Sequence, residues 1–259
     1  MAFLSLRQLG RAVESVSCRV TSPWLRFCVR QQSGAPASAN QVLTNDESLG
    51  SVHALLDPDY FGVRKLVRLK DMYEARVHWG HKEGVRNPYM APYIFGCRLG
   101  VDLIDLEQSV PLLQDALNFT AHIAYQGGII LFISRNKQNM PLVERTAKEA
   151  GEYVHCRYWS GGVFTNANIQ FGSVTRLPDL CIFINTLNNV FMQNIAVRDS
   201  AKMLIPTVGI VDTNCDPRLI TYPVPGNDDT PTAVEYYCGL FAKAIRRGKD
   251  KQKADNLKT

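Results

Sequence analysis

The sequence predicts an α/β domain built around a doubly wound, mainly parallel sheet. Residues 129–133 and 180–184 are uninterrupted apolar runs of strand length, the pattern of strands that are covered on both faces. Segments with apolar residues at helical spacing lie between such runs, so strands and helices alternate along the chain. With 259 residues, of which 46% are hydrophobic, the chain has enough apolar material for one large core.

Local patterns predict the individual elements. Glycine and proline are dense over residues 80–96, which predicts a loop before the regular alternation begins. Pro141 falls in the first turn of one helix, where its missing N–H is tolerated, and Thr230 with Pro231 marks the start of the last helix. The prolines between residues 217 and 225 predict a structural loop. The predicted strands cover residues 101–105, 129–133, 153–155, 180–184 and 207–211, and the predicted helices cover residues 106–127, 141–150, 191–203 and the segment from residue 230 onward.

The positive charge is concentrated at the two ends of the chain. The formal net charge is +5, yet residues 1–40 hold five arginines against one acid, and residues 243–259 hold seven basic against two acidic residues. The remaining residues, 41–242, carry 17 basic and 21 acidic side chains and are slightly acidic. The basic character therefore lies in the two ends, and the charge density of the C-terminal end fits attachment to a polyanion.

The composition of the N-terminus predicts a targeting segment. Residues 1–40 are rich in arginine and serine and contain Glu14 as their one acid, which is typical of a mitochondrial transit peptide. The alternative is a basic arm that binds nucleic acid directly. The predicted organisation is a transit peptide over residues 1–40, an N-terminal arm or helix over 41–75, an α/β domain over 76–245 and a basic C-terminal tail over 246–259.

Two classes of protein are disfavoured by composition. The seven cysteines are scattered without a CxxC pair, which argues against a disulfide framework and against a thiolate zinc site. No apolar run approaches the roughly 20 residues that a membrane-spanning helix needs, so no membrane partner is expected.

A doubly wound sheet raises the possibility of a nucleotide-binding enzyme, because such sheets bind ligands at the carboxyl ends of their strands. The chain contains neither GxGxxG nor GxxxxGK[ST], the glycine patterns that let the backbone approach a pyrophosphate. Arg135 and Lys137, in the turn after residues 129–133, can instead hold a phosphate of an RNA backbone or can belong to a solvated loop. We expect no cofactor and no small-molecule substrate.

Two groups of side chains could suggest a metal site or catalysis. His78 and His81 have the spacing of metal ligands, but no third or fourth ligand lies near them in the sequence. The four aspartates between residues 212 and 229 could hold Mg²⁺ or act as an acid and a base. Since no nucleophile arrangement accompanies them, these aspartates are interpreted as caps of backbone amides, and no catalytic or metal site is predicted.

Cationic and aromatic residues are interleaved in the first part of the predicted domain. From residue 64 to residue 98 there are eight basic and three acidic residues, together with Trp79 and Tyr89. Such interleaving suits contact with RNA through phosphates and stacked bases, although an ordinary surface loop can have the same composition. In this stretch and in the C-terminal tail, the basic side chains predicted to contact RNA are Arg64, Lys65, Arg68, Lys70, Arg246 and Arg247.

Three segments resemble one known family. The first comprises HWGH at 78–81, NPYMAPYIFG at 87–96, RLG at 98–100 and IDL at 104–106. The second is RYWSGGVFTN at 157–166, and the third comprises PD at 178–179, IPTVGIVDTNCDP at 205–217 and PGNDD at 225–229. In this order they resemble the universal small-subunit ribosomal protein numbered two in the bacterial scheme, and the transit-peptide composition points to its mitochondrial member.

The resemblance implies a flavodoxin-like sheet of about five parallel strands that serves as a scaffold without catalysis. It implies a structural constituent of the mitochondrial small ribosomal subunit, in the mitochondrial matrix, whose partners are ribosomal RNA and other small-subunit proteins. The RNA-contacting positions that it implies are Arg86, Asn87, Tyr89, Arg98, Arg157 and Trp159. The alternatives are a nucleotide-binding α/β enzyme of the mitochondrial matrix and a protein-only adaptor in mitochondria.

The chain departs from the family pattern in places. Bacterial members insert a long helical hairpin after the Thr-Asn pair, whereas only about a dozen residues separate Asn166 from Pro178 here, so the hairpin is expected to be absent. Asn136 stands where the family has a basic residue, beside Lys137, which implies a weaker RNA contact at that loop.

Overall fold

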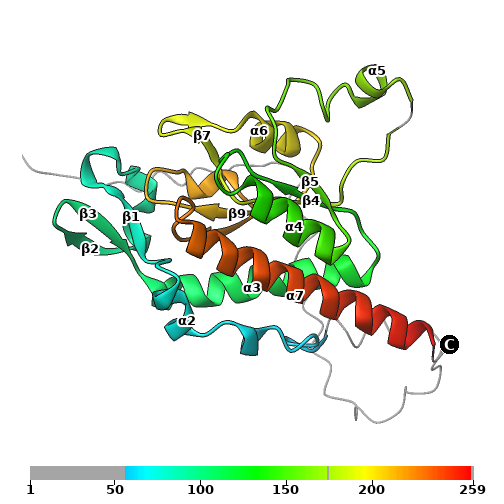
Figure 1. The fold of residues 1–259 in the computed structure, drawn as a ribbon, viewed down its shortest axis with the longest axis horizontal. Helices are drawn as coiled ribbons and strands as arrows, with labels where there is room; N and C mark the ends of the chain where they lie inside the picture. The colour runs from blue at the N-terminus through cyan, green and yellow to red at the C-terminus, as the bar shows by residue number, and fades with distance from the viewer. Residues whose placement is uncertain (1–55, 174, 258–259) are drawn as a thin grey trace, which may run out of the picture. The chain divides into compact units, whose positions relative to one another are not determined.

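A five-stranded parallel sheet forms the centre of the domain in the computed structural model, which describes residues 56–173 and 175–257 (Figure 1). Its strands are β4 (Ile130–Ile133), β5 (Tyr153–His155), β6 (Leu180–Phe183), β9 (Thr207–Val211) and β10 (Tyr222–Pro225). They are ordered β10-β9-β6-β4-β5 and every pair is parallel. Since this is the flavodoxin-like order 2-1-3-4-5, the predicted doubly wound, mainly parallel sheet is confirmed.

Helices cover both faces of this sheet. The helices are α3 (Leu106–Tyr125), α4 (Met140–Ala150), α5 (Ala167–Phe171), α6 (Ile195–Lys202) and α7 (Pro231–Asn256). Side chains of α3, α4 and α7 form one core with Phe132, Ile182 and Val208 of the sheet. On the other face, α6 packs with Phe183 and Val211 in a second core. The uninterrupted apolar strand sequences follow from this double coverage, because both faces of each central strand are buried.

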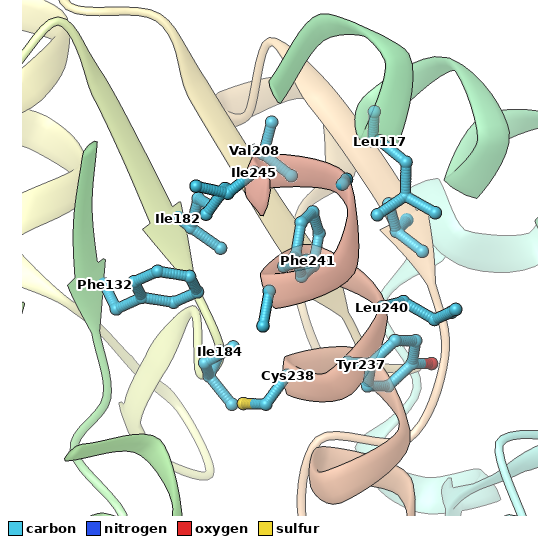
Figure 2. Packing of buried hydrophobic residues seen from close by; sticks show 14 of the residues in the cluster. Leu117, Phe132, Ile182, Ile184, Val208, Tyr237, Cys238, Leu240, Phe241 and Ile245 are labelled. Atoms are coloured by element: carbon cyan, nitrogen blue, oxygen red, sulfur yellow. The ribbon is translucent and has the colours of Figure 1, made fainter. Parts of the chain in front are cut away.

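The larger core depends on α7. Figure 2 shows Phe241 and Ile245 of α7 beside the sheet residues Phe132, Ile182 and Val208. Tyr237, Phe241 and Ile245 are fully buried. This helix has 26 residues and continues to Asn256, so residues 246–256 extend the last helix of the domain instead of forming a separate tail.

A second, antiparallel sheet precedes the parallel one. It consists of β1 (Trp79–Lys82), β2 (Ile94–Arg98) and β3 (Val101–Ile104) in the order β1-β3-β2, with the 3-10 helices η3 (Glu83–Val85) and η4 (Pro88–Tyr93) between β1 and β2. The strand predicted over 101–105 is confirmed as β3, but the loop predicted over 80–96 is wrong. Glycine and proline exclude an α-helix there, whereas short strands and 3-10 turns tolerate them.

Two further elements differ from the predictions. Residues 222–225, predicted as loop, form β10, which pairs with β9, has no second partner strand among the described residues and lies at the edge of the sheet. Prolines are accepted at an edge because they need not donate to a second neighbouring strand. The helix predicted from residue 191 begins at Ile195, where the Asn194 side chain accepts from the Ala196 N–H, and the hairpin of β7 (Leu187–Asn189) and β8 (Met192–Gln193) precedes it.

The described part of the N-terminal arm packs onto the domain. It contains η2 (Arg64–Leu66) and α2 (Leu69–Glu74), and its buried side chains Val63, Val67 and Met72 belong to the larger core. Arg247 of α7 donates to the carbonyl of Gly62, and Lys251 donates to the carbonyl of Tyr60. The transit peptide predicted over residues 1–40 lies outside the described residues. None of the described helices is long and apolar enough to cross a membrane.

The contact between α3 and α7 generates a stability prediction. A Cβ at Gly248 would lie 2.5 Å from the backbone oxygen of Ala121 on α3, whereas a Cβ at Gly239, on the same helix, would meet no described atom within 4 Å. Gly248→Ala should therefore lower the free energy of unfolding by about 1–3 kcal/mol, because the helices must move apart. Gly239→Ala should raise it by up to about 1 kcal/mol through helix propensity. Urea denaturation of both variants measures this, and a stabilising Gly248→Ala would contradict the close packing.

Candidate nucleic-acid interface

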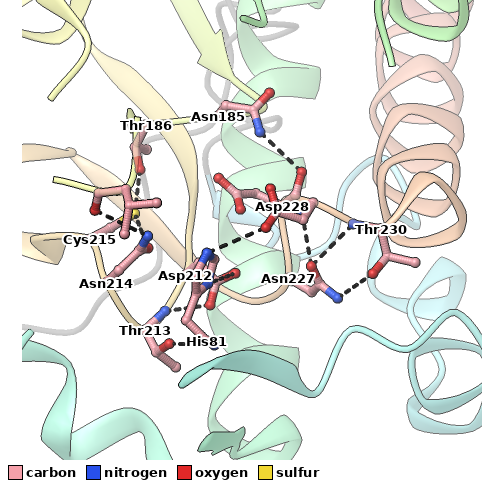
Figure 3. A network of polar contacts seen from close by, with 12 residues as sticks. His81, Asn185, Thr186, Asp212, Thr213, Asn214, Cys215, Asn227, Asp228 and Thr230 are labelled. Atoms are coloured by element: carbon pink, nitrogen blue, oxygen red, sulfur yellow. Dashed lines mark hydrogen bonds and ion pairs between the residues drawn. The ribbon is translucent and has the colours of Figure 1, made fainter. Parts of the chain in front are cut away.

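The family-like segments meet at the carboxyl edge of the parallel sheet. Asp212 directly follows β9, and Asn227 with Asp228 follows β10, so these side chains leave the sheet at the same edge. His81 of β1 lies against them. Figure 3 shows these residues in one hydrogen-bonded cluster, together with Asn185, Thr186, Thr213 and Thr230. We call His81, Asp212, Thr213 and Asn227 the polar joint, because they fasten the antiparallel sheet to the parallel one.

Thr213 holds β1 and the segment that follows it. Its hydroxyl accepts from the His81 backbone N–H at 2.8 Å, and its carbonyl accepts from the Asn87 N–H at 2.8 Å. A Cβ at Gly80 would lie only 2.5 Å from the Thr213 methyl carbon. Glycine is therefore required at this position for β1 to approach the end of β9.

Asn227 connects three segments. Its backbone N–H donates to the Val77 carbonyl at 3.0 Å, and its side-chain amide donates to the Arg76 carbonyl at 3.2 Å and to the Thr230 hydroxyl at 2.7 Å. Its side-chain oxygen accepts from the backbone N–H of Asp229 and of Thr230. One buried amide thus fixes the chain before β1 and the start of α7.

His81 and the surrounding carboxyl groups supply the electrostatics of the joint. His81 Nδ1 lies 3.0 Å from Asp212 Oδ2, and Nε2 lies 3.4 Å from Asp229 Oδ2. The hydrogen bond with Asp212 raises the pKa of His81 to about 9, with further help from the nearby aspartate charges and against the effect of burial. Burial, followed by the charges of Asp212 and Asp229, raises the pKa of Asp228 well above its usual range.

The chemistry of the joint is structural. Among residues 56–173 and 175–257, no three His, Cys, Asp or Glu side chains are grouped so that they could hold a metal ion. Cys215 is buried, its sulfur lies 2.9 Å from the Thr186 hydroxyl, and burial raises the pKa of its thiol to about 12, so it is a packed thiol at neutral pH. The pair of His81 with the buried carboxylate of Asp212 therefore joins two parts of the fold.

Arg86 makes a second internal ion pair. Its Nε donates to Asp102 Oδ2 at 2.8 Å and its Nη2 donates to Asp102 Oδ1, while the Asp102 side chain has no exposed surface. Asn87, the next residue, accepts from the Tyr89 N–H and caps η4. Both residues were predicted to contact RNA, and the structure gives both a role in holding the antiparallel sheet and η4.

Trp159, also predicted at an RNA contact, points into the second core. It is only 4% exposed, and its Nε1 donates to Asp199 Oδ2 at 3.2 Å. Its ring packs edge-on against Phe164, with ring centroids 4.7 Å apart. Trp159 therefore anchors the segment after β5 to α6, whereas its neighbour Arg157 is exposed.

The other predicted RNA-contacting residues lie on several elements and do not form one patch. Among them, Arg247 is half-buried, and the exposed ones are Arg64, Lys65, Arg68, Lys70, Tyr89, Arg98, Lys137, Arg157 and Arg246. The first four follow η2 and α2 along the arm. Lys137 and Arg157 leave the neighbouring parallel strands β4 and β5 at the same edge. Arg246 lies 3.3 Å from Glu149, and the guanidinium of Arg218 covers the Tyr89 ring at 3.2 Å.

The sequence patterns did not identify the polar joint as a unit. In the sequence, His81 has the spacing of a metal ligand and Asp212 is interpreted as a turn residue, because spacing alone does not show that β1 returns to the end of β9. Two signals could have found it. Polar residues directly follow the apolar segments that form β9 and β10, and glycines stand at positions 80 and 226 beside them.

The fold and the joint together define a doubly wound α/β domain whose carboxyl edge is tied to an antiparallel sheet by buried polar contacts. The sequence model of the family described as Ribosomal protein S2 matches residues 72–174 and 170–248. The chain belongs to this family. It is 54% identical to the small ribosomal subunit protein uS2m of Bos taurus over an alignment of 224 residues. This alignment covers 85% of this chain and 76% of the relative.

Bacterial relatives are more distant. The small ribosomal subunit protein uS2 of Rhizobium rhizogenes is 33% identical over 228 residues, covering 72% of this chain and 88% of the relative. That of Rhodopseudomonas palustris strain BisB18 is 33% identical over 231 residues, covering 73% of this chain and 68% of the relative.

The raised pKa of His81 generates a pH-dependent prediction. The pKa of His81 is about 9 in the folded protein and about 6.5 in an unfolded chain. The stabilisation by protonated His81 is therefore fully present below a pH of about 6.5. This contribution is lost as the pH rises through about 9. The destabilisation caused by His81→Gln should therefore shrink by on the order of 3 kcal/mol between about pH 6 and about pH 10, measured by urea denaturation.

His78→Gln is the matched control for that experiment. Burial lowers the pKa of His78, so this side chain is neutral in the folded and unfolded states above about pH 7. Its effect on stability should stay constant over the alkaline range. An effect of His81→Gln that is equally constant would show that Asp212 does not hold a charged imidazole.

The pair of Arg86 with Asp102 generates a second stability prediction. Arg86→Leu should lower the thermal unfolding midpoint by at least about 5 °C, because the buried Asp102 carboxylate loses both of its guanidinium hydrogen bonds. Arg98→Leu, in the same sheet but exposed, should change the midpoint far less. Adding Asp102→Leu to Arg86→Leu should restore much of the loss. Equal midpoints for the Arg86 and Arg98 variants would contradict the internal role.

Proposed function

We propose that the protein is a structural constituent of the mitochondrial small ribosomal subunit, located in the mitochondrial matrix, that binds ribosomal RNA and neighbouring ribosomal proteins. The observation that carries the proposal is the 54% identity to bovine mitochondrial uS2m over 85% of this chain. The family consists of structural ribosome components and not of enzymes. Asp212 and His81, which could resemble a catalytic pair, are accounted for by the polar joint.

The exposed cations are the proposed RNA contacts. Lys65, Arg68 and Lys70 lie on the outside of the arm with their side chains exposed, and Arg64 lies beside them. Arg98, Lys137 and Arg157 add separate contacts along the antiparallel sheet and the carboxyl edge. The side chains of Arg86, Trp159 and Arg247 are hydrogen-bonded inside the protein. We therefore propose that they position neighbouring RNA-contacting residues and do not themselves contact the RNA.

The segment between β5 and β6 is proposed to lack the helical hairpin of bacterial members. The described residues between Asn166 and Leu180 form one short helix, α5. The two stretches matched by the family model overlap at residues 170–174, as expected when the middle of the family pattern has no counterpart in the chain. We also propose that a transit peptide over residues 1–40 is removed. This leaves an arm over 41–75, the α/β domain over 76–245 and a basic segment over 246–259, of which the part up to Asn256 is the end of α7.

Sedimentation of mitochondrial lysates tests the function. The tagged protein should co-sediment with small-subunit ribosomal RNA in a sucrose gradient, and digestion with ribonuclease should move it to lighter fractions. A population that stays at the top of the gradient before digestion would exclude the ribosomal role and leave the adaptor or enzyme alternatives.

Charge reversal of the arm tests the proposed RNA contacts. Replacing Arg64, Lys65, Arg68 and Lys70 together with glutamate should lower the fraction that enters the small subunit by about tenfold or more, because several phosphate contacts become repulsive. The matched control reverses four exposed cations on α4 and α6, namely Arg145, Lys148, Arg198 and Lys202. Equal incorporation of the two variants would exclude the arm as an RNA contact.

A further inference from the structure

A polar cleft opens where the strand order of the parallel sheet reverses. It has a volume of about 620 Å³ and lies beyond the carboxyl ends of β4 and β6. From β4 the chain proceeds to β5 on one side and then returns to β6 on the other, so this is the topological switch point of the sheet. Open α/β sheets bind ligands at this place. The volume lies within the range of small-ligand sites, about 300–1,000 Å³.

One wall of the cleft is cationic. Arg135 and Lys137 come from the turn between β4 and α4. The Arg135 guanidinium is held over the Tyr158 ring at 5.0 Å, and the exposed Lys137 ammonium has no ion-pair or hydrogen-bond partner among the described residues. The same turn leads into α4, whose first turn has no acidic residue and no side-chain cap. These groups together favour an anion at this wall.

A second wall consists of side-chain amides. Asn188 and Asn189 belong to β7 and line the cleft, and their side-chain amides make no hydrogen bond with the other described residues. Asn185 is buried, and its amide is engaged inside the protein, since it accepts from the Ser134 hydroxyl and donates to the Asp228 carbonyl. Each free amide offers a donor and an acceptor in one plane, which is the pattern that pairs with the edge of a nucleobase.

The third wall contains a hydrogen-bond acceptor without making the cleft acidic. Asp229 lines the cleft with 63% of its side chain exposed, and His81 lies beside it. The pKa of His81 is raised to about 9, so its imidazole is charged at neutral pH, and burial raises the pKa of Asp228 well above its usual range, which disfavours the charged form of that carboxyl group. Three cationic side chains, Arg135, Lys137 and His81, therefore line the cleft together with the carboxyl groups of Asp228 and Asp229. A carboxylate in such a place can accept from ribose hydroxyls.

We propose that this cleft binds one nucleoside 5′-monophosphate unit, with its phosphate at Lys137 and Arg135, its base at Asn188 and Asn189, and its ribose toward Asp229. The unit is either a free mononucleotide or an unpaired nucleotide of an RNA, and the second source rests on the proposed function. A monophosphate fits because side chains supply the cations, whereas a pyrophosphate needs the glycine-rich backbone cradle that this chain lacks.

Calorimetric titration of the purified full chain tests the site with four probes: adenosine 5′-monophosphate, adenosine, inorganic phosphate and a 5′-phosphorylated unpaired RNA tetranucleotide. The monophosphate should bind at least about tenfold more tightly than adenosine or phosphate, because only it engages both walls. Tighter binding of the tetranucleotide would identify RNA as the source, and equal binding would identify the free nucleotide. Equal affinities for the monophosphate and for phosphate alone would overturn the assignment of the amide wall.

Variants locate the binding. Lys137→Ala should weaken monophosphate binding by about tenfold, whereas Lys148→Ala, an exposed lysine farther along α4, should leave it unchanged. Asn188→Ala should weaken the monophosphate but not inorganic phosphate. No binding of any probe, or equal binding by the Lys137 and Lys148 variants, would overturn the site. Co-sedimentation with the small subunit does not depend on these binding measurements. Failure of the proposed site can therefore be distinguished from failure of the proposed function.

Discussion

The buried carboxylate of Asp212 constrains the whole domain. It lies at the end of the interior strand β9 with only 1% of its side chain exposed, and a charge in that position is tolerated only when it is paired and hydrogen-bonded. His81 supplies the pairing, which requires β1 to come back to the edge of the parallel sheet. Thr213 and Asn227 then fix the chain on either side of β1. The position of the antiparallel sheet thus follows from satisfying one charge.

The net charge of a segment does not show which of its cations are available to bind a polyanion. Lys249 of α7 lies 2.6 Å from the buried Glu152, and Arg247 and Lys251 bind carbonyl groups of the arm. These cations stabilise the fold. The cations left over for a polyanion are those without a buried partner, such as Lys137 and Arg157, and only the tertiary structure distinguishes the two groups.

The parallel sheet and its helices could be predicted from the sequence because burial on both faces leaves uninterrupted apolar runs, as in residues 129–133, and because Pro141 and Thr230 mark helix starts. The strand β10 could not, since Pro223 and Pro225 resemble a loop unless the strand is known to be at an edge. For the candidate site, the sequence indicates which basic and aromatic residues are candidates for contact with RNA, but it does not indicate whether each side chain points outward or into the protein. Trp159 looks like a stacking residue in sequence, yet its indole N–H is used by Asp199.

The contact of α7 with the arm has a consequence for biosynthesis. Lys251 reaches the carbonyl of Tyr60 across 191 positions of the chain, so nearly the entire domain must leave the ribosome that makes it before this contact can form. Until then Val63, Val67 and Met72 have no α7 to cover them. A nascent chain of this protein therefore leaves part of its apolar interior uncovered until α7 has been synthesised.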